Sequence, residues 1–413
     1  MTQSVSETVD VTLTAHAYGG EALGRLPDGR AVFVPYALPG EAVRIRLLEE
    51  KRGYARAALV EVLAPSPERV QPRCPHFMDC GGCHYQHMSY PAQLAAKTDI
   101  LRSQLERLGG LKDPPVHPAI SSSQPWNYRN HIQFHLTQQG ELGYQAARSN
   151  QVIPIRECHL PEEAINSVWP QLEVEVLPGL ERISLRQGVD EEILLILESS
   201  SSQPLEFTVE ELPLSAVLLG PGGRLVLAGS DHLVMEVDGR LFRVSAESFF
   251  QVNTQMVAEM LKHLLENMPL SFDSTVLDVY CGVGLFSAFL APRVGRLIGI
   301  EVSSPACEDF AVNLDDYINV ELYEGTAEDI LPGLDVHPDV MVVDPPRSGL
   351  APRVNDRILA MGVPFLAYVS CDPSTLARDA RRLLEGGYQL VQVMPFDLFP
   401  QTYHIESISL FSR

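Results

Sequence analysis

The stretch Val276-Leu277-Asp278-Val279-Tyr280-Cys281-Gly282-Val283-Gly284 predicts the fold of the C-terminal part of this chain. It consists of a mainly apolar run, a turn with two glycines and a helical pattern that begins near Leu285. Glycine lets the backbone come close to a ligand at the carboxyl end of a strand, which is where open α/β sheets bind their ligands. Because the third glycine of a dinucleotide fingerprint is missing, a purely structural tight turn is the alternative.

The rest of the C-terminal part repeats this alternation of buried strands and helices. More apolar runs, separated by helical patterns, occur at residues 297–300, 339–343, 365–369 and 389–394. Such runs between helices are typical of a parallel sheet that is covered on both faces. We therefore expect residues 251–413 to form a Rossmann-like, doubly wound α/β domain.

Acidic residues follow two of these strands at the edge where a ligand would bind. Glu301 ends the second strand, 23 residues after Asp278, and is placed to accept hydrogen bonds from ribose hydroxyls. Asp344 opens the rigid sequence Asp344-Pro345-Pro346-Arg347 after the fourth strand. Together with the glycine turn, these acids indicate a site for a ligand that contains adenosine.

A cysteine follows another of these strands. Cys371 comes directly after the run at 365–369 and before a predicted helix. It would lie on the ligand side of the sheet, one strand away from the Asp344 loop, near a helix N-terminus that can favour its thiolate. This position indicates a reactive cysteine, although a lone cysteine is usually buried and inert. We interpret Cys281 and Cys307 as structural.

Glu406 is the carboxylate that we pair with Cys371. It precedes the final strand, at 407–411, which would carry it to the same edge of the sheet. Taken alone, a glutamate at the start of a strand is commonly solvated. A thiol beside a carboxylate would combine a nucleophile with a base.

Residues 1–64 form the predicted first domain. Apolar and polar residues alternate in short stretches from residue 9 to residue 63, with a Pro-Asp-Gly turn at residues 27–29. Several short strands in so few residues indicate a small barrel of the OB kind. Such barrels often bind single-stranded nucleic acid, and a purely structural barrel is the alternative.

Residues 65–250 form the predicted central domain, which is rich in strands. The expected strands include His131–Leu136, Glu192–Glu198, Ala216–Leu219 and Leu241–Val244. Helical spacing occurs at about 94–108 and 161–170, and it returns at 254–268 at the start of the last domain.

The central domain opens with a cysteine-rich segment. Cys74, Cys80 and Cys83 lie within ten residues, and Cys158 adds a fourth thiol. The odd total of seven cysteines argues against a disulfide framework. Four thiolates suit either structural zinc or an iron–sulfur cluster. The isolated position of the fourth cysteine favours a [4Fe-4S] cluster over the paired knuckles of zinc sites.

The charge of the chain is distributed unevenly. The net charge is −22, but residues 1–112 contain 13 Lys and Arg against 12 Asp and Glu, whereas the remainder contains 18 against 41. A nucleic acid would therefore meet the least repulsion at the N-terminal third. The N-terminus lacks the pattern of a signal peptide and no apolar run is long enough to span a bilayer, so we expect a cytoplasmic protein.

These features together resemble the RNA uracil-5-methyltransferase family, and within it the iron–sulfur branch that includes the 23S ribosomal RNA enzymes. Residues 9–63 resemble the TRAM domain of that family, and the resemblance covers nearly the whole chain. The matching motifs are Val32-Phe33-Val34-Pro35, Leu38-Pro39-Gly40-Glu41, Cys80-Gly81-Gly82-Cys83, Tyr128-Arg129-Asn130 and Phe249-Phe250-Gln251-Val252-Asn253.

The resemblance implies a methyl donor, S-adenosylmethionine, and a covalent mechanism at uridine C5. Cys371 would be the nucleophile, and Glu406 would be the base that removes the C5 proton. The residues implied to contact S-adenosylmethionine are Gln251, Tyr280, Glu301 and Asp344. The residues implied to hold a [4Fe-4S] cluster are Cys74, Cys80, Cys83 and Cys158.

The implied partner is RNA, with ribosomal RNA as the first choice and transfer RNA as the alternative, and we expect a monomer. Two other functions fit parts of the sequence. A methyltransferase for a small molecule or a protein would use the glycine turn but would leave the barrel, the cysteine-rich segment and Cys371 without a joint purpose. A non-enzymatic RNA-binding protein would not need Cys371, Glu406 and Asp344.

Overall fold

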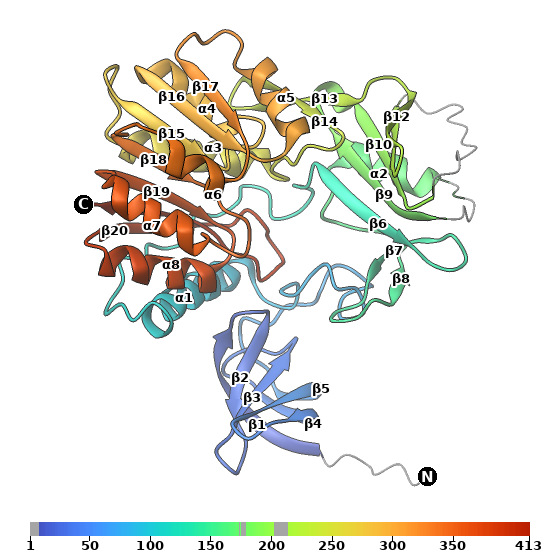
Figure 1. The fold of residues 1–413 in the computed structure, drawn as a ribbon. Coiled ribbons are helices and arrows are strands. Elements are labelled where there is room, and N and C mark those ends of the chain that lie inside the picture. Colours follow the sequence, from blue (N-terminus) through green and yellow to red (C-terminus); the bar gives the residue numbers. More distant parts are fainter. Residues whose placement is uncertain (1–7, 173, 175–178, 202–213) are drawn as a thin grey trace.

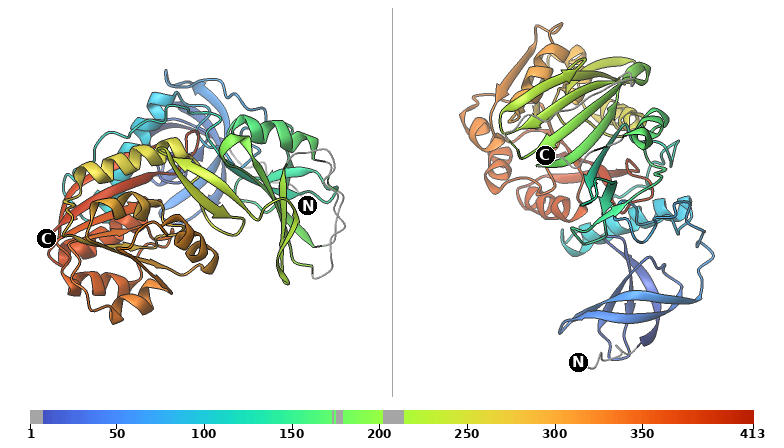
Figure 2. Two further views of the ribbon diagram at one scale, coloured as in Figure 1. Left: turned by 90° about the horizontal axis from the view of Figure 1, so that it is seen from above. Right: turned by 90° about the vertical axis from the view of Figure 1, so that its right-hand side faces the viewer.

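The computed structural model describes residues 8–172, 174, 179–201 and 214–413. Residues 1–7, which open the predicted first domain, lie outside these described residues. The described chain forms a small N-terminal barrel, a strand-rich central part and a C-terminal α/β part (Figure 1). Two further views show that the barrel projects from the other two parts (Figure 2).

The N-terminal part is a closed barrel, as the alternation of apolar and polar residues predicts. Its strands are β1 Thr8–Ala17, β2 Glu21–Arg25, β3 Ala31–Pro35, β4 Ala42–Glu50 and β5 Tyr54–Ala64. They follow one another around the barrel in the order β1-β2-β3-β5-β4. Leu13, Val32 and Ile45 belong to the buried core of the barrel, and their neighbours along the strands are more exposed. The OB-like barrel is therefore confirmed.

The central part is a mixed sheet with the strand order β12-β11-β10-β9-β6-β7-β8. Its elements are β6 His131–Leu136, β7 Leu142–Gln145, β8 Val152–Pro154, α2 Glu163–Val168, β9 Leu180–Gln187, β10 Ile193–Ser199, β11 Ser215–Gly220 and β12 Gly223–Ala228. A separate hairpin pairs β13 His232–Val237 with β14 Arg240–Ser245. The expectation of a strand-rich domain is confirmed.

The C-terminal part is a sheet with the order β17-β16-β15-β18-β19-β21-β20. Its strands are β15 Thr275–Val279, β16 Arg296–Glu301, β17 Val320–Glu324, β18 Val340–Val343, β19 Phe365–Ser370, β20 Gln389–Phe396 and β21 Glu406–Ser412. Its helices are α3 Thr254–Asn267, α4 Leu285–Leu290, α5 Ser304–Asn313, α6 Ala327–Ile330, α7 Pro352–Met361 and α8 Pro373–Glu385. Strands β15 to β19 run parallel to one another, whereas β21 runs antiparallel to both of its neighbours, β19 and β20. This arrangement confirms the doubly wound α/β domain.

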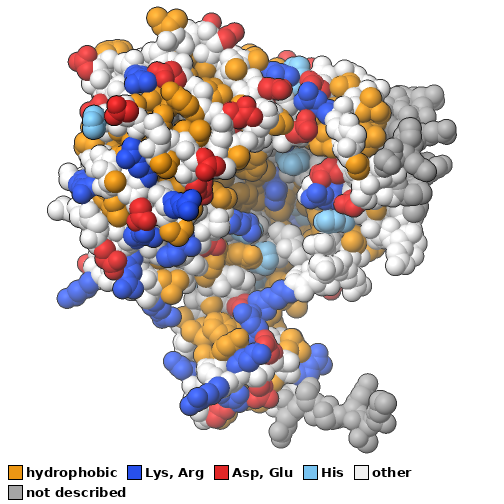
Figure 3. Space-filling model, in the orientation of Figure 1, with side chains coloured by type: hydrophobic (Ala, Val, Ile, Leu, Met, Phe, Trp, Pro, Cys, Tyr) orange, Lys and Arg blue, Asp and Glu red, His pale blue; other side chains and the backbone are white. Residues whose placement is uncertain are grey.

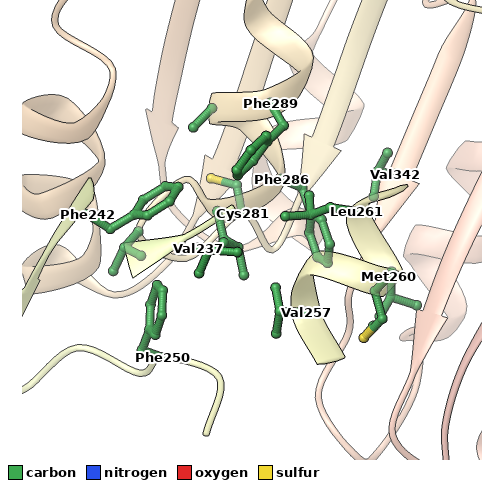
Figure 4. Packing of buried hydrophobic residues seen from close by; sticks show 14 of the residues in the cluster. Val237, Phe242, Phe250, Val257, Met260, Leu261, Cys281, Phe286, Phe289 and Val342 are labelled. Atoms are coloured by element: carbon green, nitrogen blue, oxygen red, sulfur yellow. The ribbon is translucent and has the colours of Figure 1, made fainter. Parts of the chain in front are cut away.

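Two elements that precede residue 251 pack on the C-terminal sheet. Helix α1, Tyr90–Arg107, packs against α8. The β13–β14 hairpin buries Phe242 against Phe289 of α4, with ring centroids 6.1 Å apart, in a core that α3 also lines (Figure 4). The predicted boundary at residue 251 therefore falls between Phe250 and Met256, which belong to the same hydrophobic core. No helix in the described ranges is both long and apolar enough to cross a membrane.

Candidate active site

In the glycine turn after β15, one glycine is required for close packing and another borders open space. Tyr280, Gly282 and Gly284 adopt positive φ angles of 68°, 54° and 86°. A Cβ added at Gly284 would lie 2.3 Å from Leu314 Cδ1, so this glycine is needed where α5 ends against the turn. A Cβ added at Gly282 would meet nothing within 4 Å. The turn therefore presents open space at the carboxyl end of β15.

Glu301 fastens this turn from the neighbouring strand, β16. One carboxylate oxygen accepts a hydrogen bond from Gly282 N at 2.9 Å. The other oxygen accepts hydrogen bonds from Val302 N and Ser303 N, each at 2.8 Å. The side chain is half-buried, and each oxygen of a carboxylate has lone-pair capacity for more than one donor. A ribose hydroxyl can therefore still donate to it.

Two further carboxyl groups lie at this edge, Asp278 within β15 and Asp344 directly after β18. Burial raises the pKa of Asp278 to about 6, and the Ser287 hydroxyl donates to it at 2.6 Å. Burial, followed by the repulsion of Asp278, raises the pKa of Asp344 to about 7. Both groups therefore hold a proton more strongly than a solvated aspartate does.

The structure brings Cys371 and Glu406 together although they are distant in the sequence. Strands β19 and β21 are antiparallel neighbours, and Ser370 lies opposite Ser407. Cys371 follows the end of β19, and Glu406 begins β21, so both occupy the same corner of the sheet. Strand β18, on the other side of β19, ends beside them at Asp344.

The charges around Cys371 oppose its ionisation. Burial, followed by Glu406 and Asp344, raises the pKa of the thiol to about 12, while Arg347 acts in the opposite direction. Helix α8 is capped by Asp372, because its Oδ1 accepts hydrogen bonds from the backbone N–H groups two and three residues later, at 2.8 and 3.0 Å. These donors are therefore already engaged. The prediction that this helix end favours the thiolate is wrong for the free protein.

The carboxyl group of Glu406 is buried in a field of mixed sign. Burial, followed by Asp344, raises its pKa well above the usual range, whereas Arg347 and Lys97 lower it. Arg347 also approaches the loop before β21, where its Nη2 lies 3.3 Å from His404 Nδ1. Two cations thus balance part of the negative charge that Glu406 would carry.

Lys97 was missed in the sequence analysis. Lys97 belongs to α1, and its side chain is buried. Its ammonium group donates to Asp397 Oδ1 at 2.5 Å and to Phe399 O at 2.9 Å. A sequence signal did exist, because Lys97 lies between Leu94 and Leu101 on the apolar face of the predicted helix. A lysine on such a face needs a buried anion as partner.

Gln251 lies in the segment before α3, and this segment contacts the loop 397–405. Asn130 Nδ2 donates to the Gln251 carbonyl at 3.0 Å. Asn253, which caps α3, donates to Leu398 O at 3.2 Å. The neighbouring Phe249 is 72% exposed, which is unusual for an aromatic side chain. Asn253, two residues after Gln251, thus attaches this segment to the loop that leads to β21.

The four predicted cluster ligands line one cavity in the central part. Cys74, Cys80, Cys83 and Cys158 surround about 270 Å³, together with Ile132 of β6, Tyr144 of β7 and Ile155, which follows β8. Burial is the main cause that raises the pKa of each thiol, to about 11 for Cys80, and neighbouring thiols add to the effect at Cys80, Cys83 and Cys158. Among the described residues, no group of three or more His, Cys, Asp or Glu side chains is arranged to hold a metal ion.

The segment with the first three of these cysteines is attached to β7. Gly81 N donates to Gln145 O at 2.9 Å, and Cys80 forms an isolated bridge with Ala146. A Cβ added at Gly81 would lie 2.8 Å from Gln145 O, so the close approach requires glycine. The backbone therefore holds the segment against the central sheet next to the cavity.

The surface between the three parts is hollowed, and its charge differs from that of the whole chain. Lys, Arg and His side chains gather in and around the hollow, while many acidic side chains lie on the outer surface (Figure 3). Phosphate groups are attracted to such a basic concavity. The net charge of −22 is therefore compatible with an anionic partner at this face.

Comparison with protein families matches two parts of the chain. Residues 3–60 match the TRAM domain. Residues 230–413 match a family described as tRNA (uracil-5-)-methyltransferase. This second match begins just before the β13–β14 hairpin, in agreement with the packing of the hairpin on the C-terminal part.

Relatives of similar length occur in distant bacteria. A Gloeobacter violaceus protein described as an uncharacterized RNA methyltransferase is 33% identical and aligns over 98% of this chain and 97% of its own length. An Aquifex aeolicus protein with the same description is 34% identical over 97% of each chain. In fold, the chain is similar to the crystal structure of Pyrococcus abyssi tRNA (uracil-54, C5)-methyltransferase in complex with S-adenosyl-L-homocysteine. That likeness has a TM-score of 0.74 at 22% identity and covers 98% of this chain and 100% of the other.

Proposed function

The chain belongs to the RNA uracil-5-methyltransferase family, and from this premise we propose that it methylates C5 of a uridine in ribosomal RNA through a covalent bond to Cys371. The observation that carries the proposal is the meeting of Cys371 and Glu406 at adjoining ends of β19 and β21, beside Asp344. A nucleophile and a proton acceptor in one pocket are what this reaction requires.

The chemistry explains why both side chains are needed. Uracil C5 is a poor nucleophile, but attack of the Cys371 thiolate on C6 forms an S–C6 bond and moves the ring electron pair toward O4. S-adenosylmethionine supplies the methyl group from its sulfonium, and C5 takes it up. Glu406 then removes the C5 proton, the C5–C6 double bond forms again, and the S–C6 bond breaks to return the thiolate.

The shifted pKa values define how the protons move. Because the pKa of the thiol is about 12 in the free protein, Cys371 loses its proton as the uridine is attacked, and water carries that proton away so that the Glu406 carboxylate remains free to accept the C5 proton. Arg347 lowers the pKa of both Cys371 and Glu406, so it stabilises the charged form of each. A carboxylate with a raised pKa accepts a proton more readily than a solvated one, which suits Glu406 as the base.

We assign the methyl donor to the carboxyl ends of β15, β16 and β18. The open space at Gly282 and the spare lone pairs of Glu301 suit an adenosine moiety. Tyr280 and Asp344 lie at the ends of adjacent strands, and Gln251 approaches from the segment before α3. These residues fit the donor that the family uses.

A [4Fe-4S] cluster held by the four central cysteines is part of the proposal. The cavity of about 270 Å³ is lined by thiols from two distant segments, and thiolates are the ligands that such clusters take. Cys74, Cys80 and Cys83 of one segment and Cys158 of the other would hold the cluster, which would tie the two segments together through its bonds to their thiolates. We assign it a structural role, because the resemblance and the cavity require no more.

RNA is the proposed partner, and ribosomal RNA is preferred to transfer RNA on the resemblance to the iron–sulfur branch. The barrel and the basic hollow support a polyanionic partner. We place the protein in the cytoplasm, as a monomer, where such an RNA is available. Transfer RNA is the second candidate, because the Pyrococcus abyssi protein of similar fold is described as a tRNA enzyme.

The test is covalent trapping on RNA that contains 5-fluorouridine. Fluorine at C5 cannot leave as a proton does, so the reaction stops at the S–C6 adduct after methyl transfer. Protein prepared without oxygen is mixed with S-adenosylmethionine and with substituted ribosomal or transfer RNA, and denaturing gels then detect the adduct. We expect an adduct with ribosomal RNA that is lost in Cys371→Ala.

The two RNAs separate the alternatives. An adduct with transfer RNA alone would reassign the substrate while keeping the mechanism. No adduct with either RNA, although S-adenosylmethionine binds, would refute methylation at uridine C5 and favour another methyl acceptor.

A further inference from the structure

A side chain of the N-terminal barrel contacts both loops of the candidate active site. Tyr18 lies just after β1, and its hydroxyl donates to Asp372 Oδ2 at 2.9 Å. Its ring meets the ring of Tyr403 edge-on, with centroids 5.8 Å apart. Asp372 directly follows Cys371, and Tyr403 lies three residues before Glu406. One barrel residue therefore bridges the segments that carry the nucleophile and the base.

The packing around Tyr18 is too close to be a loose domain contact. A Cβ added at Gly20, in the same turn, would lie 3.1 Å from His84 Cβ and 3.3 Å from Tyr403 Cδ1. The backbone N–H groups of His84 and Tyr85 both donate to Gln401 O, at 2.9 and 3.0 Å. The barrel turn, the cysteine-rich segment and the loop 397–405 thus meet around the Tyr403 ring.

Asp372 transmits this contact to Cys371. Its Oδ1 accepts hydrogen bonds from Ser374 N and Thr375 N, while its Oδ2 accepts the hydrogen bond from Tyr18. The carboxylate is therefore held from both sides, by the first turn of α8 and by the barrel. Because Cys371 is the residue before Asp372, the direction of its thiol depends on how firmly this carboxylate is held.

We propose that Tyr18 is a positioning residue for the methyl transfer, which holds the Cys371 loop through Asp372 in the geometry required for attack on the uridine. The barrel then contributes to the chemical step as well as to the hold on RNA. This inference rests on the proposed function, because it concerns the same reaction. It identifies a hydroxyl group more than 350 residues away in the sequence as a determinant of the reaction rate.

The test compares Tyr18→Phe with Tyr54→Phe. The first variant removes one oxygen and keeps the ring against Tyr403, and the second removes the hydroxyl of a barrel tyrosine whose ring meets Phe33, 6.0 Å away. We measure the rate of adduct formation at saturating 5-fluorouridine RNA, the Kd for RNA, the Kd for S-adenosylmethionine and the Tm. For Tyr18→Phe we expect a rate about tenfold lower, the effect of one hydrogen bond to a charged acceptor.

The controls separate positioning from binding and from stability. Both Kd values of Tyr18→Phe should stay within about twofold of wild type, and Tyr54→Phe should react at the wild-type rate. Asp372→Asn keeps the cap of α8 but changes the acceptor for Tyr18. If Tyr18 acts through Asp372, the double variant is no slower than the slower single variant.

Each contrary result has a separate meaning. An unchanged adduct rate in Tyr18→Phe, or strictly additive effects in the double variant, would overturn the inference while the proposed function stands. Weaker RNA binding with an unchanged rate would make Tyr18 an RNA contact and would also overturn it. If wild-type protein forms no adduct, the proposed function fails first, and the inference fails with it.

Discussion

Cys371 and the four cysteines of the central part are all partly buried, yet their surroundings differ. Cys371 stands alone at a corner of regular strands, among carboxyl groups and the cation of Arg347. The central four lie on irregular segments around a mainly apolar cavity. Other thiols of the cavity are among the groups that raise the pKa of Cys80 and Cys83. Burial raises the pKa of the thiol in both places.

The difference shows how neighbours decide what a buried thiol can do. At Cys371, the cation of Arg347 can stabilise a thiolate for a short time, and the carboxyl group of Glu406 lies close enough to accept a proton from the substrate, which suits a nucleophile. Around the central cavity, four thiolates would repel one another unless cations stay among them, which suits a bound metal cluster. Under the proposed function, cysteine would therefore act as a nucleophile in one region and as a ligand that holds two segments together in the other.

Replacement of Cys371 should have the largest effect on the reaction. We expect Cys371→Ala to lower the methylation rate at least about a thousandfold, because no other group can form the covalent adduct. Iron content, S-adenosylmethionine binding and Tm should remain as in wild type. Methyl incorporation into RNA with labelled donor provides the measurement.

The control for this loss is Cys307→Ser, which alters a buried cysteine of α5 that we interpret as structural. It should keep most of the methylation activity. Residual methylation above a few per cent in Cys371→Ala would contradict the covalent mechanism.

Replacement of Cys83 should lower iron content and stability, which Cys371→Ala leaves unchanged. The size of this effect should be smaller than the loss of methylation in Cys371→Ala. Cys83→Ala removes the most enclosed of the cavity thiols, and we expect iron and acid-labile sulfide to fall to background. The free energy of unfolding should fall by about 2 kcal/mol or more, the scale of losing a covalent cross-link. Metal and sulfide analysis, together with denaturant unfolding under argon, measures both effects.

The same measurements on Cys307→Ser serve as the control, with iron unchanged and stability within about 1 kcal/mol of wild type. Wild-type protein that contains one zinc ion and no sulfide would replace the cluster by a single-ion site. Bound iron that survives Cys83→Ala would exclude this cysteine as a ligand.

Replacement of Asp344 should have the smallest effect, a change in how the stability of the fold depends on pH. It tests the surroundings of Cys371, where carboxyl groups gather. The pKa of Asp344 is raised from 3.8 to about 7, so the folded state binds this proton more tightly than the unfolded state does. Its contribution to stability is therefore present below pH 3.8 and is lost as the pH rises through about 7. Because the side chain is partly exposed, solvent screening reduces the size of this loss.

Asp344→Asn should remove this part of the pH dependence. Urea unfolding of wild type and variant across this pH range should give curves that diverge as the pH rises, with the variant more stable at the upper end. Curves that stay parallel would show that Asp344 is ionised in the folded protein like a solvated aspartate.

Much of the candidate site followed from local patterns. The run that ends at Tyr280, the acid after β16 and Cys371 after β19 lie at strand ends, and strand ends can be read from apolar runs bounded by turns. Strand β17, Val320–Glu324, was absent from the predicted runs, because it is an edge strand whose residues are partly exposed and less apolar. The pattern method therefore failed where burial was incomplete.

The effect of the helix end on Cys371 and the identity of the partner of Lys97 could not be predicted in this way. The Cys371 pKa depends on Glu406 and Asp344, which belong to other strands. Lys97 lies on an apolar helix face, and its partner Asp397 is 300 residues further along the chain. Electrostatic partners of this kind are set by distances in space, which local sequence patterns do not contain.

The sequence by itself determined the strand–helix alternation, the barrel, the cysteine spacing and the motif residues, because each depends on neighbours within a few positions. Only the tertiary structure decided that β21 lies between β19 and β20, so that Glu406 adjoins Cys371. It also decided that Tyr18 of the barrel reaches Asp372. The physical reason is that strand order and domain docking arise from contacts between distant segments, whose partners are selected by the packing of the whole fold.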